Sequence, residues 1–181
     1  QLALEAGQMG VWEWDPISHF CSLDERSLDL FGLTPDAFDS RDASVFGSIH
    51  PEDRTRVMRT VQKALENRRL YKAEFRVLDE RGRVRWLRCV GRPSYDEKGV
   101  PVWVNGICYD ITERKQFEET LAESRERYRL LFENSPLPSL IVGRETLEIL
   151  EDNKAAAQLY GYTRREFLKM SVLDLRPAEE I

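Results

Sequence analysis

The chain has 181 residues, of which 33% are charged and 41% hydrophobic, with a formal net charge of −5 and a pI near 5.3. This composition is typical of a soluble globular protein, and the length suffices for one large domain or for one ordinary domain plus part of another. The acidity argues against a nucleic-acid binder. No apolar run reaches the roughly 20 residues that span a bilayer, so we expect no membrane segment here and a cytoplasmic location. The chain does not begin with Met, and we therefore expect a piece of a longer protein whose other parts could include a membrane anchor.

The cysteines argue against a metal site. Cys21, Cys89 and Cys108 are widely spaced, none forms a CxxC pair, and the chain has only two histidines. A zinc site needs ligands at closer and more regular spacing. We interpret the three cysteines as reduced thiols that pack as small hydrophobic side chains.

The first quarter of the chain predicts a strand, a second short strand and a helix. Residues 10–16 alternate around two tryptophans and end at Asp-Pro, which predicts a strand followed by a turn. Residues 19–33 begin as a short strand and become helical where Leu28 and Phe31 fall three apart. Gly32 is expected to end that helix.

Two further helices are expected before the next strands. Residues 34–39 predict a short helix with Thr34 as its N-cap and Pro35 at its first position. Residues 50–67 predict a longer helix, because Pro51 lies in the first turn and acidic residues suit the positive end of the helix dipole. Its apolar positions form one stripe that would face a core.

Three strands follow in a meander. Residues 71–78 and 84–95 are separated by a turn in which Gly82 is expected to take a positive φ. A second short turn leads into residues 101–109. Such short turns require antiparallel neighbours, so we predict an α+β fold with one antiparallel sheet and helices on one face.

The pattern then restarts in a diverged internal repeat. Leu, Gly, Thr and Phe coincide when residues 30–38 are placed over residues 159–167, an offset of 129 positions. At the same offset, the strand-like residues 11–15 match residues 140–144. Farther along, residues 48–51 match residues 174–177, because the loop before them is three residues shorter in the second copy. The second copy lacks the three-strand meander. A sheet without those strands is not expected to be stable alone, so we interpret the second copy as truncated.

These motifs together resemble a known family. The runs GVWEWD, HPEDR, EFRVLDERGRVRWL and DITERK resemble a PAS domain with its C-terminal PAC motif, over roughly residues 2–116. The run from residue 131 to residue 167 resembles the front half of a second PAS domain. The resemblance implies a PAS fold with a five-stranded antiparallel sheet and flanking helices. We therefore divide the chain into a PAS domain with PAC motif (1–112), a helical, coiled-coil-like linker (113–133) and the N-terminal half of a second PAS domain (134–181).

No motif of a catalytic site is present. The sequence lacks GxSxG, HExxH, a phosphate-binding glycine loop, a GGDEF-like run and a phosphoacceptor histidine motif. His50 directly precedes a proline that starts a helix, so capping or packing explains it better than haem ligation. His19 lies in a predicted turn and is expected to be solvated. We predict that this part of the protein is not an enzyme and has no metal-binding or catalytic residues. We expect the longer parent protein to be an enzyme, a histidine kinase or a diguanylate cyclase.

The cofactor, if any, is expected to be non-covalent. Photosensory relatives that bind flavin covalently carry an Asn-Cys-Arg-Phe run, and this run is absent. A non-covalent flavin or a small metabolite fits better, with Trp86, Trp103 and Asn105 as candidate residues of a pocket between sheet and helices. The alternative is that these tryptophans are ordinary core or sheet-surface aromatics.

The run DITERK joins the last strand to a long helix without a loop. Asp110 can cap this helix with Glu113 in a capping-box-like pair, or Thr112 can serve as the cap. In PAS proteins the Asp-Ile-Thr motif is where sensor meets linker, and here it comprises Asp110, Ile111 and Thr112. We expect this junction to pass a displacement of the sheet to the helix.

The helix after this junction has the pattern of a dimer seam. Its candidate positions follow 4-3-4-3 spacing and are Phe117, Leu121, Ser124, Tyr128 and Leu131. We expect a parallel homodimer through this linker helix, although two heptads are fewer than a convincing coiled coil needs. The alternative is a lone amphipathic helix that docks on either PAS core.

The resemblance implies a sensory role. We expect a module that binds a small ligand or dimerises and relays the change to an output domain downstream in the same chain, with a histidine kinase favoured over a diguanylate cyclase or phosphodiesterase. A ligand-free dimerisation scaffold is the other alternative. The arginines of the meander, Arg76, Arg83, Arg85, Arg88 and Arg92, are expected to pair with Glu74 and similar acids on a solvated sheet face.

Overall fold

The structure is a computed structural model that describes residues 7–79 and 81–175. It divides into two compact units, Gln1–Phe117 and Glu118–Ile181. Each unit is described by itself below.

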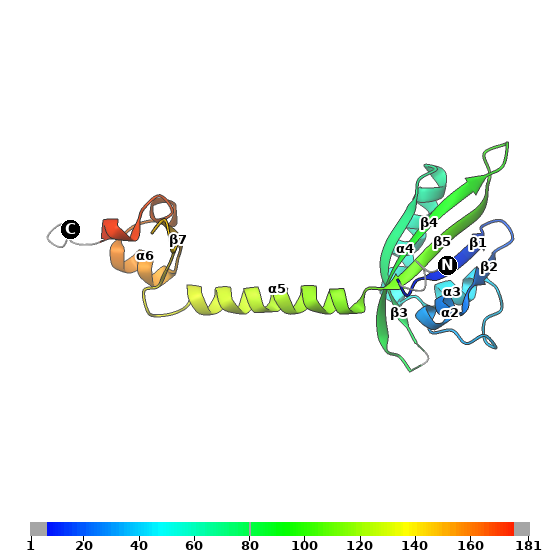
Figure 1. The fold of residues 1–181 in the computed structure, drawn as a ribbon, viewed down its shortest axis with the longest axis horizontal. Coiled ribbons are helices and arrows are strands. Elements are labelled where there is room, and N and C mark those ends of the chain that lie inside the picture. Colours follow the sequence, from blue (N-terminus) through cyan, green and yellow to red (C-terminus); the bar gives the residue numbers. More distant parts are fainter. Residues whose placement is uncertain (1–6, 80, 176–181) are drawn as a thin grey trace. The chain divides into compact units, whose positions relative to one another are not determined.

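The first unit contains one five-stranded antiparallel sheet (Figure 1). The spatial order is β2-β1-β5-β4-β3, so the first strand lies between the second and the last. The strands are β1 (Gly10–Asp15), β2 (Phe20–Leu23), β3 (Tyr71–Leu78), β4 (Val84–Tyr95) and β5 (Pro101–Asp110). The predicted strands and their antiparallel pairing are confirmed, and Gly82 takes the expected positive φ of 73°.

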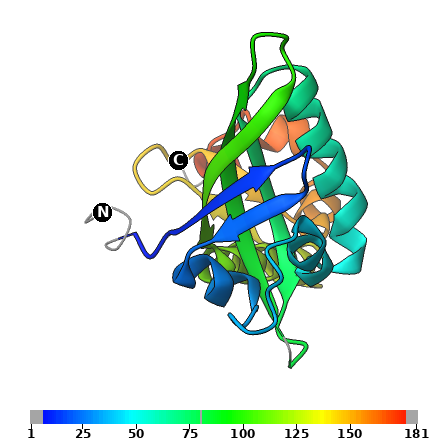
Figure 2. The same cartoon turned by 90° about the vertical axis from the view of Figure 1, so that its right-hand side faces the viewer.

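Three helices cover one face of this sheet (Figure 2). They are α2 (Glu25–Phe31), α3 (Asp42–Ser48) and α4 (Pro51–Glu66). The alternation of β3 turns Tyr71, Ala73, Phe75 and Val77 toward them, while the residues between point outward. The core therefore lies between the inner face of the sheet and the helices, as the predicted α+β class requires.

The ends of two helices follow from local sequence. The Asp24 side chain accepts the N–H of Ser27 at the start of α2, and Gly32 ends the helix with φ 68°. At the start of α4, His50 Nδ1 accepts the N–H of Glu52 at 3.4 Å, directly before Pro51. The predicted capping role of His50 is confirmed.

One predicted helix is wrong. Residues 34–39 form only a single turn, in which Thr34 O accepts the N–H groups of Ala37 and Phe38. The helix α3 was not expected from the sequence, and its N-cap Arg41 makes no side-chain capping bond. This helix starts without a local signal, and its apolar residues Val45 and Phe46 pack against the core.

A pair of glycines makes room for Trp12 on the inner face of the sheet. Gly91 of β4 lies opposite Gly106 of β5, and Gly106 lies opposite Trp12 of β1. A Cβ at Gly106 would lie 2.3 Å from Trp12 Cζ2, and one at Gly91 would lie 2.5 Å from Trp12 Cη2. The indole ring therefore lies flat across two neighbouring strands, a position that no larger residue at either glycine would allow.

The helix α5 (Thr112–Glu133) begins where β5 ends. It has 22 residues, and none of them is buried. Among the described residues, no helix, α5 included, is both long enough and apolar enough to cross a membrane.

The second unit repeats the start of the first. It contains β6 (Leu140–Val142), β7 (Ile149–Asp152), α6 (Lys154–Tyr160), α7 (Arg164–Phe167) and the 3-10 helix η1 (Val172–Leu175). At the offset of 129 positions, β7 falls on β2 and α6 falls on α2, end for end. Asn153 caps α6 as Asp24 caps α2, and Gly161 ends α6 with φ 76°. The predicted pairing of residues 48–51 with 174–177 extends past residue 175 and lies partly outside the described residues.

The two copies differ at one short helix, for a local reason. In the second copy Thr163 and Glu166 form a capping box, and α7 follows. In the first copy Ala37 occupies the position of Glu166, so no side chain returns to the N-cap, and residues 34–39 stop after one turn. Phe167 is fully buried in the second unit.

Candidate functional site

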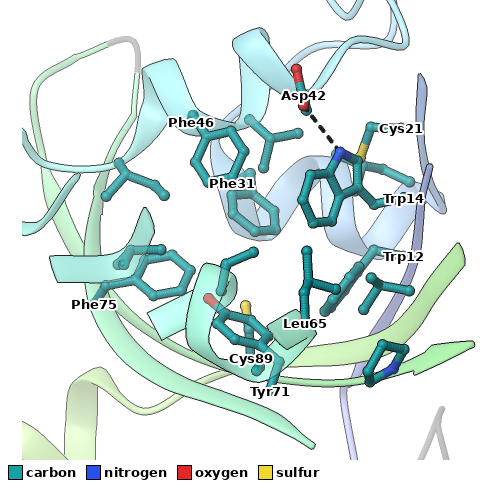
Figure 3. A pocket seen from close by; sticks show the side chains of 18 residues that line it. Trp12, Trp14, Cys21, Phe31, Asp42, Phe46, Leu65, Tyr71, Phe75 and Cys89 are labelled. Atoms are coloured by element: carbon teal, nitrogen blue, oxygen red, sulfur yellow. Dashed lines mark hydrogen bonds between the residues drawn. The ribbon is translucent and has the colours of Figure 1, made fainter. Parts of the chain in front are cut away.

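A cavity of about 70 Å³ lies between the sheet and the helices of the first unit (Figure 3). All five strands and the helices α2, α3 and α4 contribute to its wall. The side chains are almost entirely apolar; those labelled in Figure 3 are Trp12, Trp14, Cys21, Phe31, Asp42, Phe46, Leu65, Tyr71, Phe75 and Cys89. Such a wall suits an apolar ligand and offers a polar ligand few hydrogen-bonding groups.

The single acid in the wall is already occupied. Asp42 Oδ2 accepts the indole N–H of Trp14 at 3.0 Å, and His19 Nδ1 lies 2.9 Å from the same oxygen. The His19 side chain is 66% exposed, in agreement with the prediction that it is solvated. Asp42 therefore fixes Trp14 and the β1–β2 turn rather than presenting a free charge to the cavity.

A second tryptophan of the wall has an unpaired donor. Trp12 Nε1 is buried and has no hydrogen-bond partner in the described structure. Leaving a buried N–H unpaired costs about 1–3 kcal/mol, and natural proteins rarely accept this cost without a partner or a function. Trp12 Nε1 is therefore a candidate donor for a bound molecule, beside the hydroxyl of Tyr71, which also belongs to the wall.

Two ionisable groups of the wall are buried. Burial raises the pKa of the Cys21 thiol to about 12 and raises the pKa of Tyr71 well above its usual range. Neither of these two groups carries charge at neutral pH. The described residues also contain no cluster of three or more His, Cys, Asp or Glu side chains suited to a metal ion.

The candidate pocket residues lie elsewhere, and their prediction is wrong. In β5 the buried residues are Val104 and Cys108, so Trp103 and Asn105 point to the opposite face, where both are exposed. Trp86 lies next to buried Leu87 in β4, so its side chain points to the opposite, outer face of the sheet. None of the three lines the cavity. In β4 and β5 both faces are partly apolar, so no signal in the sequence indicated which face is inner, and the helices decide this.

Trp86 instead belongs to a cationic site on the outer face of the sheet. Arg76 Cζ lies 5.7 Å from the Trp86 ring centre, and Lys115 Nζ lies 5.2 Å from it. Both distances suit cation–π attraction. Lys115 belongs to the first turn of α5, so Trp86 holds the start of that helix against β4.

Glu74 of β3 also links the sheet to the start of α5, through ion pairs. Its carboxylate lies 2.7 Å from Arg114, 2.9 Å from Lys115 and 3.3 Å from Arg88. Hydrogen bonds from Lys115 and Arg114 hold the Glu74 pKa below its usual value, in spite of partial burial. We call Glu74, Arg88, Arg114 and Lys115 the Glu74 cluster; it links β3 and β4 to the first turn of α5.

The junction residues are also bonded to the sheet. Ile111 is 6% exposed, and its N–H donates to Trp86 O at 2.9 Å. The Thr112 hydroxyl accepts the N–H of Trp86 at 2.9 Å, while Asp110 Oδ1 accepts the N–H of Thr112 at 2.7 Å. Of the two predicted alternatives, Asp110 thus serves the start of the helix, and Thr112 bonds the neighbouring strand. The helix begins fixed to β4 at two points.

The predicted seam residues are accessible in the single chain. Phe117, Leu121, Tyr128 and Leu131 are 67%, 53%, 48% and 69% exposed. Exposed apolar side chains at this spacing suit a helix partner. Self-association itself stays a prediction.

Sequence reasoning missed the two residues at the centre of the cavity wall. Trp12 and Trp14 are two positions apart and so share one face of β1, while Glu13 between them is exposed. The alternation alone could have placed both indoles in the core. Nothing in the sequence indicated that Asp42 would pair with Trp14, because α3 itself has no local start signal.

The family models agree with this geometry. A model described as "PAS fold" matches residues 20–108, and one described as "PAS domain" matches residues 126–180. A crystal structure of a sensory box histidine kinase/response regulator from Burkholderia thailandensis is 32% identical, with a TM-score of 0.65. The match covers 72% of this chain and 98% of that one. The chain belongs to the PAS family.

Curated relatives place this PAS protein among sensory signalling proteins. "Probable diguanylate cyclase DgcE" of Escherichia coli is 27% identical over 95% of this chain, and a "Blue-light-activated histidine kinase" of Brucella anthropi is 25% identical over 89% of it. The matched region spans only 15% and 32% of these relatives. Their PAS regions thus belong to longer multidomain sensor proteins, and the role of this chain is sensory signal transduction.

Proposed function

We propose that the first unit senses a small, largely apolar molecule in the cavity and relays its binding through the junction to α5. The observation that carries this proposal is the buried, unpaired Trp12 Nε1 in a mostly apolar wall whose single acid, Asp42, is already paired. A ligand with one hydrogen-bond acceptor would pair with this donor and remove the cost of leaving it unpaired. The cavity therefore favours a molecule with one polar atom and an apolar body.

The size of the cavity favours a ligand of a few heavy atoms. Its volume is about 70 Å³, whereas sites for drug-sized ligands typically hold roughly 300–1,000 Å³. A flavin would need a large rearrangement of the tryptophans and of α3. Of the two cofactor alternatives, the structure supports the small metabolite.

A matched pair of probes tests the cavity and the donor together. Cyclopentanone and methylenecyclopentane have almost the same shape, but only the ketone accepts a hydrogen bond. We expect the ketone to shift the indole N–H resonance of Trp12 in a nitrogen-15 NMR spectrum and to bind at least about tenfold more tightly, the value of a hydrogen bond of about 1.4 kcal/mol.

Trp12→Phe removes the donor and keeps the aromatic ring, so it should abolish the difference between the two probes. Trp14→Phe is the control, because the Trp14 N–H is already bound to Asp42. If neither probe perturbs any of the four tryptophan resonances of the chain, the cavity is not a ligand site.

The relay follows from the bonds at the junction. β4 and β5 form part of the cavity wall, and β4 is bonded to Ile111 and Thr112. A ligand that moves these strands would move the first turn of α5. We propose the domains 1–112, 113–133 and 134–181, a homodimer through α5, and an output domain farther along the chain, with a histidine kinase favoured and a diguanylate cyclase as the alternative.

A ligand-free dimerisation scaffold remains the second candidate. It is favoured by the small cavity and by the exposed seam of α5. Native mass spectrometry separates the two candidates: a small-molecule adduct on the purified protein supports the sensor. A dimer of adduct-free mass that no metabolite stabilises against heat supports the scaffold.

A further inference from the structure

Two of the three cysteines lie directly opposite each other in the sheet. Cys89 of β4 pairs in register with Cys108 of β5. Both are buried, at 3% and 0% exposure, and both are free thiols. The sequence placed them nineteen positions apart with no hint of contact, so this pair is a product of the strand register.

The hydrogen-bond pattern makes this a close pair. The N–H of Ile111 donates to Trp86 O, which marks residues 86 and 111 as a hydrogen-bonded pair. From this pair the register continues without a shift, and Cys89 opposite Cys108 is the third pair after it. Hydrogen-bonded and non-hydrogen-bonded pairs alternate, so Cys89 and Cys108 form a non-hydrogen-bonded pair.

Such a position brings two cysteines within reach of a disulfide. The Cα atoms of a non-hydrogen-bonded pair are about 4.5 Å apart, at the short end of the roughly 4.4–6.8 Å found across disulfides. Both side chains point to the inner face of the sheet, because Leu87, Cys89 and Gly91 are the buried positions of β4 and Val104 and Cys108 those of β5. The register and the shared face thus place the two sulfur atoms on neighbouring strands in a position that suits a disulfide.

The surroundings distinguish this pair from the third cysteine. Ser27 Oγ lies 3.5 Å from Cys108 Sγ. Hydrogen bonds from Cys89 and Ser27 lower the pKa of Cys108, whereas burial raises the pKa of Cys89. Cys21 has no cysteine opposite it, since its partner in β1 is Trp14. Cys21 is thus an internal control.

We propose that Cys89 and Cys108 form a reversible dithiol–disulfide pair that hydrogen peroxide oxidises. Cys89 lines the cavity, whose volume of about 70 Å³ admits a molecule the size of peroxide but not a bulky disulfide reagent. The cavity brings the oxidant to the pair, and Cys108 lies next to Cys89.

The reaction balances with peroxide as the only oxidant. The thiolate of one cysteine of the pair attacks one peroxide oxygen, the O–O bond breaks, and hydroxide leaves and takes up a proton to form water. The resulting sulfenic acid is attacked by the sulfur of the other cysteine, which loses its proton as a second water leaves. Two thiols and one peroxide thus give one disulfide and two waters. A thiol reductant reverses the change by exchange.

Peptide mapping of the intact protein tests the pair directly. The folded chain is treated with hydrogen peroxide, the peroxide is removed, and the chain is unfolded in iodoacetamide, which blocks the remaining thiols, before digestion with trypsin. We expect residues 89–98 and residues 99–114 to appear as one disulfide-linked species two hydrogens lighter than the sum of the peptides, and dithiothreitol to separate them. Cys21 should be found alkylated by iodoacetamide, which shows that peroxide left its thiol unoxidised.

Matched variants assign the roles. Cys21→Ser should leave the linked species unchanged, while Cys89→Ser and Cys108→Ser should each abolish it. In the Cys89→Ser and Cys108→Ser variants, dimedone added as the protein unfolds should label a sulfenic acid on the remaining cysteine of the pair.

Three results would overturn the proposal. They are three free thiols after peroxide treatment of the folded protein, a linked species that contains Cys21, or a link that forms only after unfolding. Mapping of the unsubstituted protein gives each of these answers even if a cysteine variant fails to fold. The result is independent of the proposed ligand, because the pair can oxidise in a protein that binds neither cyclopentanone nor methylenecyclopentane.

Discussion

At the scale of single residues, the fit between Trp12 and its glycines decides whether the inner face of the sheet can form. The Cβ of Ala at position 106 would lie 2.3 Å from the Trp12 ring and 2.4 Å from Val90 O. One of these neighbours is backbone within the sheet, so it cannot move aside cheaply. Overpacking of this kind costs typically 1–3 kcal/mol.

We therefore expect Gly106→Ala to lower the free energy of unfolding by about 1–3 kcal/mol in urea titration. Gly47→Ala is the control, because a Cβ at Gly47 in α3 meets nothing within 4 Å. This control should be neutral or stabilising by up to about 1 kcal/mol, since Ala favours a helix over Gly. Equal effects of the two substitutions would contradict the packing of Trp12.

Asp53 is the buried charge whose loss should show in the pH dependence of stability. It is 6% exposed, and its carboxylate accepts the backbone N–H of Arg76 at 2.9 Å and bonds its guanidinium at 3.0 Å. These bonds hold the pKa of Asp53 well below its ordinary value of 3.8. The carboxylate thus stabilises the fold above about pH 3.8, and this stability is lost as the pH falls toward the lower folded pKa.

Asp53→Asn should therefore cost about 1.5–3 kcal/mol at pH 7, the value of hydrogen bonds to a charged group. The difference from the unsubstituted protein should shrink as the pH is lowered below 3.8, because the unfolded chain then takes up a proton on Asp53 while the folded carboxylate stays charged. Thermal unfolding from pH 7 to pH 2.5 measures both effects. The exposed Asp36→Asn makes the same charge change and should show neither.

At the scale of elements, the first turn of α5 is held by side chains of β3 and β4. Glu74→Gln should weaken the Glu74 cluster while keeping the size of the side chain. The Glu74 side chain is 29% exposed, so we expect a modest effect of about 0.5–1 kcal/mol. Amide hydrogen exchange over residues 112–117 should become about two- to fivefold faster.

Glu97→Gln, in the exposed turn between β4 and β5, is the matched control and should leave the exchange unchanged. The effect should also decrease in high salt, because the pairs are partly exposed. If exchange in residues 112–117 is the same in both variants, the Glu74 cluster does not anchor the helix, and the bonds of Ile111 and Thr112 alone do so.

The elements also show where sequence prediction succeeded and where it failed. Strands β3 and β4 and the helix α4 carry their own signals, namely alternation, a turn glycine with positive φ, and a proline in the first helical turn. The helix α3 has no side-chain cap and is stabilised by its packing. The predicted helix at residues 34–39 lacks the acidic partner that Glu166 supplies in the second copy, and Thr34 and Pro35 alone did not suffice.

At the scale of the whole molecule, self-association through α5 is the first question. Replacing Leu121 and Tyr128 by Lys puts like charges at the proposed dimer core, where unpaired charge is costly. We expect light scattering to report a dimer for the unsubstituted chain and a monomer for the double variant. Ala122→Lys with Leu130→Lys adds the same charge at positions outside the seam and should leave the dimer intact. A monomeric unsubstituted chain would end the coiled-coil proposal.

The continuity of α5 gives the second prediction at this scale. Each inserted residue lengthens a helix by about 1.5 Å and rotates the downstream segment by about 100°. In the full-length protein, seven residues inserted after Glu119 should preserve regulation, while three or four should lock the output on or off. The output activity across inserts of one to seven residues measures this. A smooth and weak dependence on length would indicate a flexible tether instead.

The sequence by itself determined the family, the succession of the strands along the chain, the internal repeat and the start of the long helix. Each of these depends on residues close together in the chain, such as the alternation of β3 or the capping positions that recur after 129 residues. Only the tertiary structure decided which face of the sheet is inner. That choice moved Trp86, Trp103 and Asn105 away from the cavity, and the register of β4 and β5 brought Cys89 opposite Cys108. The physical reason is that a strand presents both faces equally until helices cover one of them, and the register between strands depends on turns and packing rather than on either strand alone.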